Sequence, residues 1–118
     1  MTRHKLPRPT SRAELELRQE ALVEGFKRIT PMPRAKLRNN FGFQMIARAV
    51  RDLGRETDSN APAWVKYGLQ EYWRPDNEDF EHHCDLCELD PDTVREHAYY
   101  AGLLDFLDPV PEVFDGSA

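Results

Sequence analysis

Apolar residues recur at helical spacing in the first third of the chain. The stripe consists of Leu15, Leu22, Phe26 and Ile29. Ser11 and Glu14 have the spacing of a capping box, in which a hydroxyl and a carboxylate satisfy free amides of the first helical turn. Pro31 disfavours helical backbone at Thr30. The pattern therefore predicts an amphipathic helix over residues 11–29.

Two more helices are predicted in the middle of the chain. Residues 34–40 form a polar link into a helix over 41–53, and Gly54 is suited to the left-handed residue that ends it. The apolar face of this helix consists of Phe43, Ile46, Ala47, Val50 and Leu53. Pro62 fits the first turn of a third helix, over about 62–73.

The third helix carries a cluster of aromatic residues. The cluster consists of Trp64, Tyr67, Tyr72 and Trp73. Exposed aromatic rings can stack on bases or anchor a partner, but the apolar neighbours of this cluster favour a place in the core. We expect the buried face of the helix to consist of Val65, Leu69 and Tyr72. No window shows the period-two alternation of a strand, so the fold class is predicted to be all-α.

Two short helices are predicted next, over residues 78–88 and from Pro91 to about 104. Asp90 can cap the second of them, and Pro91 fits its first turn, where a missing amide does no harm. The first presents Phe80, Cys84 and Cys87 on one side, and the second presents Val94, His97, Ala98 and Ala101.

The junction of these helices, within residues 79–104, has the pattern of a helix-turn-helix corner. A small residue, Cys84, is followed at intervals of five by Leu89 and Val94, and this spacing lets two helices approach and fill the angle between them. Glu88 stands where the turn usually has glycine. A plain helical hairpin without a DNA role has the same pattern, so both interpretations stay open here.

The predicted organisation is a small bundle of four to five helices with flexible termini. Residues 1–10 form a basic arm with two prolines, and residues 11–104 form a single helical domain. The tail, residues 105–118, mixes acidic and apolar residues. It is either a disordered partner-binding segment or a strap that folds back over the core.

Charge is distributed very unevenly along the chain. Residues 1–38 hold ten Lys/Arg and four Glu, whereas residues 39–118 hold six Lys/Arg and seventeen Asp/Glu, which together give the net charge of −5. Residues 76–92 hold eight acids and no Lys or Arg. The basic end is suited to binding phosphates, and the acidic stretch is suited to a basic partner.

Several classes of function are disfavoured by the sequence. No apolar run approaches the roughly 18 residues of a membrane span, and no apolar segment follows the basic N-terminus, as a secretory signal would require. Two cysteines three positions apart do not make a disulfide framework, so we expect a reduced, cytosolic chain. No nucleophile elbow, phosphate loop or paired carboxylate site is present, so neither an enzyme nor a cofactor is expected.

A zinc site is the one metal centre that the sequence suggests. Its candidate ligands are His82, His83, Cys84, Cys87 and His97. Zinc needs four ligands in tetrahedral geometry, but the two cysteines lie within a predicted helix and lack a second pair. We therefore expect the cysteines to be small core residues, with His83 and His97 packed at a helix junction and no metal bound.

Three sequence elements together carry a family resemblance. The run Ala-Val-Arg-Asp-Leu at 49–53 is followed by Trp73 and by residues 80–95, which read Phe-x-x-x-Cys-x-Leu-x-x-Leu-Asp-Pro-Asp-x-Val-Arg. This order resembles small phage- and prophage-borne helical proteins, which usually carry Ala-Gly in place of Cys87-Glu88. The resemblance covers under half of the chain and implies a helix-turn-helix-like module in the cytoplasm of a bacterial host cell. DNA-binding phage proteins of this size include transcription regulators and small terminase subunits, which assemble as rings.

We therefore predict a non-enzymatic, phage-derived protein that binds double-stranded DNA as a homo-oligomer, in transcription regulation or DNA packaging. The expected DNA contacts are Arg3, Lys5, Arg8 and Arg12 of the arm, with Thr93, Arg95 and Tyr99 of the last helix. The alternative is an acidic interaction protein. In that case residues 76–92 and the tail would bind a host or phage protein such as RNA polymerase or a nuclease.

Overall fold

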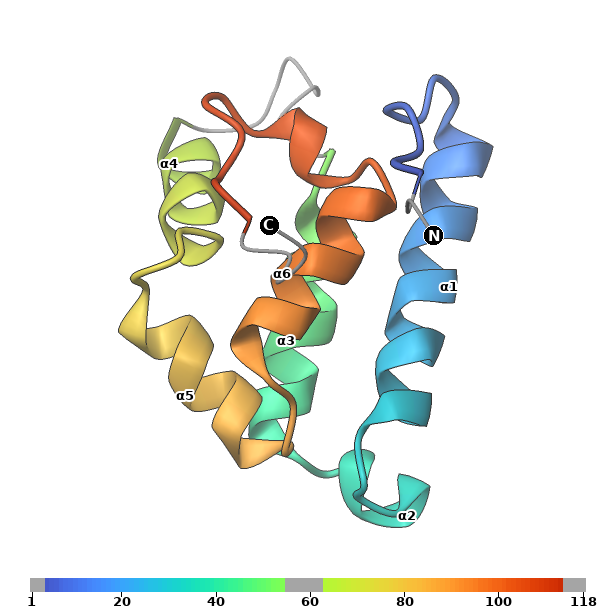
Figure 1. Cartoon of the computed structure of the whole chain (residues 1–118), viewed down its shortest axis with the longest axis vertical. Coiled ribbons are helices and arrows are strands. Elements are labelled where there is room, and N and C mark those ends of the chain that lie inside the picture. The colour runs from blue at the N-terminus through green and yellow to red at the C-terminus, as the bar shows by residue number, and fades with distance from the viewer. Residues whose placement is uncertain (1–3, 55–62, 114–118) are drawn as a thin grey trace.

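The computed structural model describes residues 4–54 and 63–113, with the side chain of Val65 left out. In these ranges the chain forms helices and no strand, so the predicted all-α class is confirmed (Figure 1). The helices are α1 (Arg12–Ile29), α2 (Arg34–Leu37), α3 (Phe41–Asp52), α4 (Ala63–Tyr72), α5 (Glu78–Leu86) and α6 (Pro91–Tyr100), followed by the 3-10 turn η2 (Leu104–Phe106).

Four of these helices begin at a side chain that caps their first turn. Ser11, Asn40, Asn77 and Asp90 each accept a hydrogen bond from the backbone N–H three residues later, at 2.8–3.1 Å. The predicted capping box of α1 forms only in part. The Glu14 carboxylate accepts from the N–H of Thr10, at 3.3 Å, rather than from that of Ser11.

The C-terminal ends of α5 and α6 share one backbone motif. Glu88 and Gly102 follow these helices with positive φ angles of 56° and 77°. After α5, Leu89 N donates to Cys84 O at 2.9 Å and Glu88 N donates to Asp85 O at 3.1 Å, and the same two bonds close α6. This pair of bonds is the Schellman motif, whose left-handed residue is usually glycine. In the corner, a glutamate adopts that conformation.

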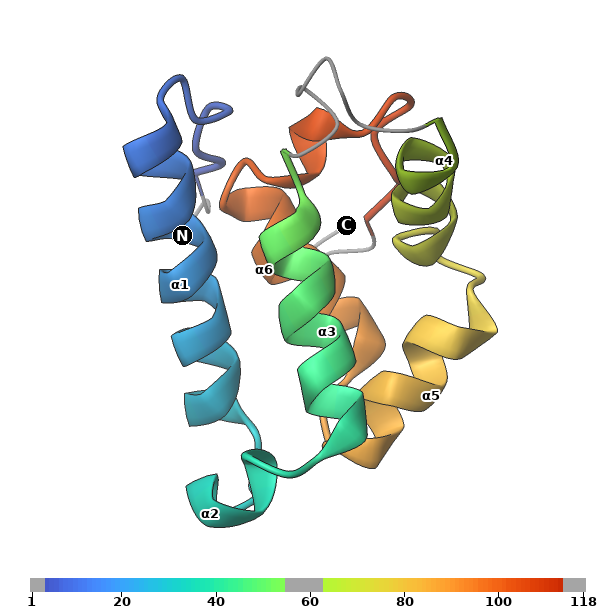
Figure 2. The same cartoon turned by 180° about the vertical axis from the view of Figure 1, so that it is seen from behind.

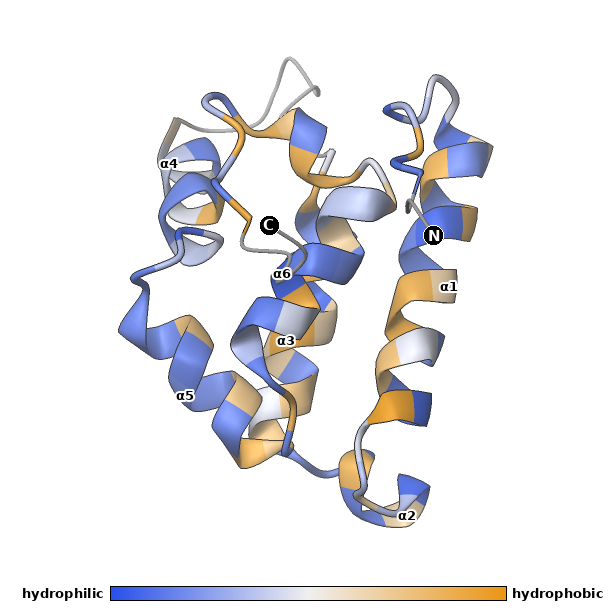
Figure 3. Cartoon of the chain, in the orientation of Figure 1, coloured by the Kyte–Doolittle hydropathy of each residue, from blue (hydrophilic) through white to orange (hydrophobic). Residues whose placement is uncertain are grey.

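The core lies where α1, α3, α5 and α6 meet, and it contains the apolar residues that the spacing predicts. All five predicted residues of the α3 face are buried, and so are Cys84, Leu89 and Val94 of the corner. Figure 3 shows hydrophilic residues predominating along α5, whose buried side is narrow. The predicted stripe of α1 is wrong at Ile29, which is exposed near the helix end, whereas Val23 and Gln19 are buried.

The predicted aromatic core is correct for only part of α4. Trp73 is fully buried and Tyr72 is half-buried with its ring edge-on to that of Trp73, but Trp64 and Tyr67 are 75% and 68% exposed. The reason is the spacing along α4: Leu69 and Trp73 face the bundle, so Trp64 and Tyr67 lie on the opposite side of the helix. The predicted burial of Val65 lies outside the described residues.

The described residues near both ends of the chain pack against the bundle. Leu6 N donates to Tyr100 O at 2.9 Å, and Lys5 forms an ion pair with Asp105. In the tail, Leu107 is buried, and the Gln70 side chain is hydrogen-bonded to the backbone of residues 108 and 109. Residues 105–113 thus follow the strap alternative, and residues 114–118 lie outside the described part.

Candidate nucleic-acid interface

The structure places the predicted DNA contacts of the last helix among intramolecular partners. Thr93 is half-buried, and its hydroxyl donates to the capping carboxylate of Asp90 at 2.9 Å. Tyr99 is also half-buried, with the ammonium of Lys5 5.3 Å from its ring centroid. The arm and the last helix therefore meet at Lys5 and Tyr99.

Arg95 is a structural residue in this fold. It is 2% exposed, its guanidinium donates to Arg74 O at 2.9 Å, and its guanidinium carbon lies 4.4 Å from the centroid of the Phe80 ring. Burial lowers the pKa of Arg95, and the Asp92 carboxylate at 3.5 Å raises it in part. Arg95 is the only Lys or Arg of α6, so the exposed face of this helix offers no guanidinium or ammonium group. Its spacing could have predicted burial, because Arg95 lies beside Val94 on the inward side.

The remaining predicted contacts belong to the arm. Arg8 lies over the Phe106 ring, 5.2 Å from its centroid, and Arg12 is exposed with Glu16 3.4 Å away. Arg3 lies outside the described residues. Every described cation of the arm therefore has an intramolecular partner. In the described residues, the arm and α6 together form no row of unpaired cations that could face a groove of DNA.

A basic surface that was not predicted lies at the other end of α1. Here α1 and α3 run side by side and α2 joins their ends (Figure 2). The helices enclose a hollow of about 350 Å³ lined by Val23, Lys27, Arg34, Leu37, Arg38, Phe43, Gln44, Ala47 and Arg51. We call this hollow the basic groove. Residues 34–40 were predicted to be a polar link, but Leu37 is buried and holds α2 against the bundle, which turns its cations to the rim.

Three cations of the groove have acidic partners. Arg51 donates two hydrogen bonds to Glu20, at 2.8 and 3.2 Å, and both Lys27 and Arg34 pair with Glu24, at 2.8 and 3.4 Å. These hydrogen bonds lower the pKa values of Glu20 and Glu24. Two carboxylates thus pair with three cations, so the rim of the groove keeps a positive net charge.

Three further cations are exposed and unpaired. The side chains of Arg28, Lys36 and Arg38 form no hydrogen bond or ion pair with any residue that the structure describes. Arg38 lines the groove, and Arg28 and Lys36 lie beside groove residues on α1 and α2. An incoming polyanion can bind such unpaired cations without first breaking an intramolecular ion pair.

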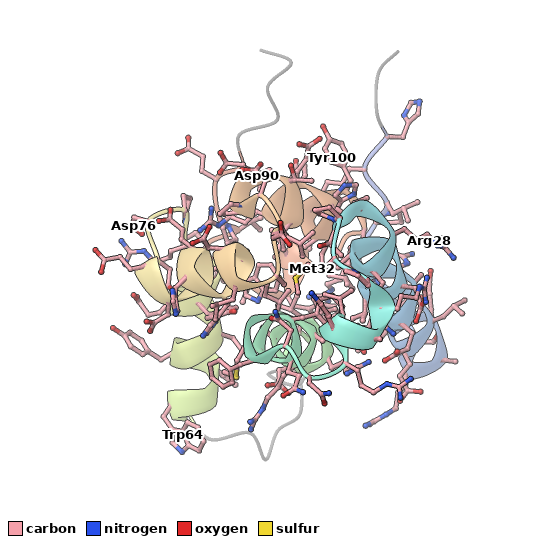
Figure 4. All side chains as sticks on the ribbon, turned by 90° about the horizontal axis from the view of Figure 1, so that it is seen from below. Arg28, Met32, Trp64, Asp76, Asp90 and Tyr100 are labelled. Atoms are coloured by element: carbon pink, nitrogen blue, oxygen red, sulfur yellow. The ribbon has the colours of Figure 1, made fainter. Side chains whose placement is uncertain are left out.

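The acidic residues gather on the opposite side of the molecule. Figure 4, seen from below, places Arg28 and Asp76 at opposite edges. Along α5, Glu78, Glu81 and Asp85 are exposed on the side away from the core and have no ion pair among the described residues. We call these three residues the acidic stripe. The uneven distribution of charge along the sequence therefore corresponds to a basic side and an acidic side of the molecule.

The two cysteines and His83 of the suggested zinc site take part in packing, whereas His82 is exposed. Cys84 and Cys87 are fully buried, and burial raises their thiol pKa values to about 12 and about 11. His83 is buried with Nδ1 2.8 Å from the Tyr72 hydroxyl. Within residues 4–54 and 63–113, no group of three or more His, Cys, Asp or Glu side chains is placed to hold a metal ion. The prediction that the cysteines are core residues is confirmed.

No protein-family model, curated protein or solved structure matches this chain. In the described part of the chain, no helix is both long enough and apolar enough to cross a bilayer.

Proposed function

We propose that this protein binds double-stranded DNA through the basic groove and the cations beside it. The observation that carries the proposal is the set of unpaired, exposed cations Arg28, Lys36 and Arg38 around a positively charged rim. Such a surface binds phosphates and releases their condensed counterions, whatever the net charge of the whole molecule.

The acidic side of the molecule does not oppose this binding strongly. The molecule measures 38 × 36 × 29 Å, so even its shortest extent is about three Debye lengths in 0.1 M salt. Asp76 and the basic Arg28 lie at opposite edges (Figure 4). Salt therefore screens most of the repulsion between the acidic edge and a duplex bound at the basic one.

Helix α1 connects the basic groove with the predicted arm contacts. It has 18 residues, a length of about 27 Å, with Arg12 at its start and Lys27 and Arg28 in its last turn (Figure 1). A duplex lying along α1 reaches both ends, so Arg3, Lys5, Arg8 and Arg12 belong to the proposal as secondary contacts. With these contacts the protein would act without catalysis, in phage transcription regulation or DNA packaging.

Fluorescence anisotropy with a labelled duplex across a salt series tests the proposal. Arg38→Ala is expected to lower the slope of log K against log salt by about 0.9, the value for one lost phosphate contact. Lys36→Ala is expected to do the same. The matched control is Lys66→Ala, since Lys66 is exposed and unpaired on α4, away from the groove. A wild-type protein that does not bind duplex DNA at low salt overturns the proposal.

The acidic stripe favours a second candidate function. Its exposed, unpaired carboxylates suit the basic surface of a host or phage protein such as RNA polymerase or a nuclease. In that function the protein would compete with nucleic acid for its partner. Clear DNA binding together with a pull-down that retains neither of these partners would exclude this candidate.

A further inference from the structure

The basic groove and the acidic stripe are complementary but lie on different sides of one molecule. The stripe residues Glu78, Glu81 and Asp85 follow each other at spacings of three and four, so they share one face of α5. The groove lies between α1, α2 and α3. Within the described structure neither surface is neutralised by the other.

We propose that the basic groove binds the acidic stripe of a second copy of this chain. The contact joins two different surfaces, so it is heterologous, and each added copy leaves one groove and one stripe free. The assembly therefore grows as an open chain or closes as a ring. Either form uses the unpaired carboxylates of the stripe and the unpaired Arg38 of the groove.

Both surfaces also combine charged groups with apolar side chains. From Glu78 to Asp85 the stripe extends about 10 Å along α5. Leu86 is exposed beside Asp85 and offers an apolar side chain to the groove, whose floor is formed by Val23, Leu37, Phe43 and Ala47. Each exposed ion pair contributes little, so several have to form together and the contact weakens as salt rises.

This contact has a consequence for regulation that rests on the proposed DNA binding. Arg38 and Arg34 would serve both the acidic stripe of a second copy and the DNA phosphates. Self-association and DNA binding therefore compete, and free protein assembles while DNA-bound protein exposes its acidic stripes. The self-association itself does not depend on DNA and is measured without it.

Sedimentation velocity at about 0.1 mM protein, a concentration that populates weak contacts, tests the proposal in low and high salt. Wild-type protein is expected to sediment as oligomers in low salt and as a monomer in high salt. Glu81→Lys lowers the charge of the stripe from −3 to −1, and Arg38→Glu puts a carboxylate in place of an unpaired groove cation, so each variant alone is expected to be monomeric in low salt. An equimolar mixture is expected to associate again, because the intact groove of the Glu81→Lys variant then meets the intact stripe of the Arg38→Glu variant.

Two control variants carry the same charge changes outside both surfaces. Lys66→Glu on α4 and Glu112→Lys in the tail are expected to retain the wild-type association, and circular dichroism checks that every variant is folded. The proposal is overturned by a wild-type monomer in low salt, by association of both single variants, or by a mixture that stays monomeric. Loss of DNA binding with retained self-association overturns the proposed function alone.

Discussion

Gln19 is a buried polar residue that joins α1 to the end of α3. It lies in α1, is only 5% exposed, and its side-chain amide donates to the carbonyls of Val50, Arg51 and Leu53 at 3.2, 3.2 and 2.7 Å. The last carbonyls of a helix have no intrahelical donor, so α1 supplies what the end of α3 lacks. We expect Gln19→Leu, which nearly preserves the side-chain size, to remove these bonds without opening a large cavity.

The expected destabilisation follows from the number of buried carbonyls. Two of the three bonds are buried, and leaving a buried acceptor without a donor costs about 1–3 kcal/mol, so Gln19→Leu is expected to lose about 3 kcal/mol. A chain of 118 residues has an unfolding entropy of about 0.25 kcal/mol/K, so Tm is expected to fall by about 12 °C. Thermal and urea unfolding followed by circular dichroism measure both quantities.

Two variants at the surface and at the same site sharpen this test. Glu16→Leu, exposed on the same helix, is expected to change stability by less than about 0.5 kcal/mol. Gln19→Glu places a carboxylate against carbonyl oxygens at the negative end of α3, which raises its folded-state pKa. Its stability relative to wild type is therefore expected to be highest below about pH 4.3 and to fall as pH rises. A loss below about 1 kcal/mol in Gln19→Leu would refute the role given to this amide.

Three further predictions concern helix contacts and are checked by urea unfolding. A Cβ at Gly42 would overlap the His83 carbonyl and lie 2.7 Å from Leu86 Cβ, so Gly42→Ala is expected to cost about 3 kcal/mol, and an unchanged midpoint would contradict the close crossing of α3 and α5. Glu88 has a φ of 56°, so Glu88→Gly is expected to add about 1 kcal/mol to the free energy of unfolding, whereas Glu88→Ala, which also removes the charge but keeps a Cβ, is not. Burial lowers the pKa of His83, so stability should be complete above about pH 6.5 and fall below it; His83→Gln, which cannot titrate, should flatten this dependence.

Local signals in the sequence predicted the helices and the corner. The face of α3 was predictable because five apolar residues share one helical side, and the corner was predictable because Cys84, Leu89 and Val94 combine with the cap at Asp90. Caps and periodicity depend on neighbours in the chain, so one sequence contains enough information to place them.

The functional surfaces depend on tertiary contacts and were harder to predict. Arginine is a residue type that often contacts DNA, but the position of Arg95 beside Val94 takes its side chain into the space between Phe80 and the end of α4. The groove was missed because its cations come from three helices, one of which, α2, is held against the bundle by the buried Leu37. Burial of one side of α4 likewise decided which aromatic residues face solvent.

Side chains that reach the carbonyl ends of other helices are a recurring feature of this fold. Thr30 donates to Cys87 O at 2.7 Å and Asn40 to Leu86 O at 2.8 Å, so two residues that flank α2 hold the end of α5. Arg18 likewise donates to Ala101 O at 3.0 Å, at the end of α6. Hydrogen bonds have preferred distances and angles, so these bonds fix the relative positions of the helices more strictly than apolar contacts alone.

The same device sets the shape of the basic groove. Its two long walls, α1 and α3, are joined by the buried Gln19 bonds and, at the surface, by the paired hydrogen bonds from Arg51 to Glu20. The walls therefore have little freedom to move apart, and Arg38 projects from a backbone that Gln44 fixes through a 2.9 Å bond to Arg38 O. A ligand that binds here meets cations already in position and pays less in lost flexibility. Loosening the walls by Gln19→Leu should thus weaken phosphate binding without removing any charge.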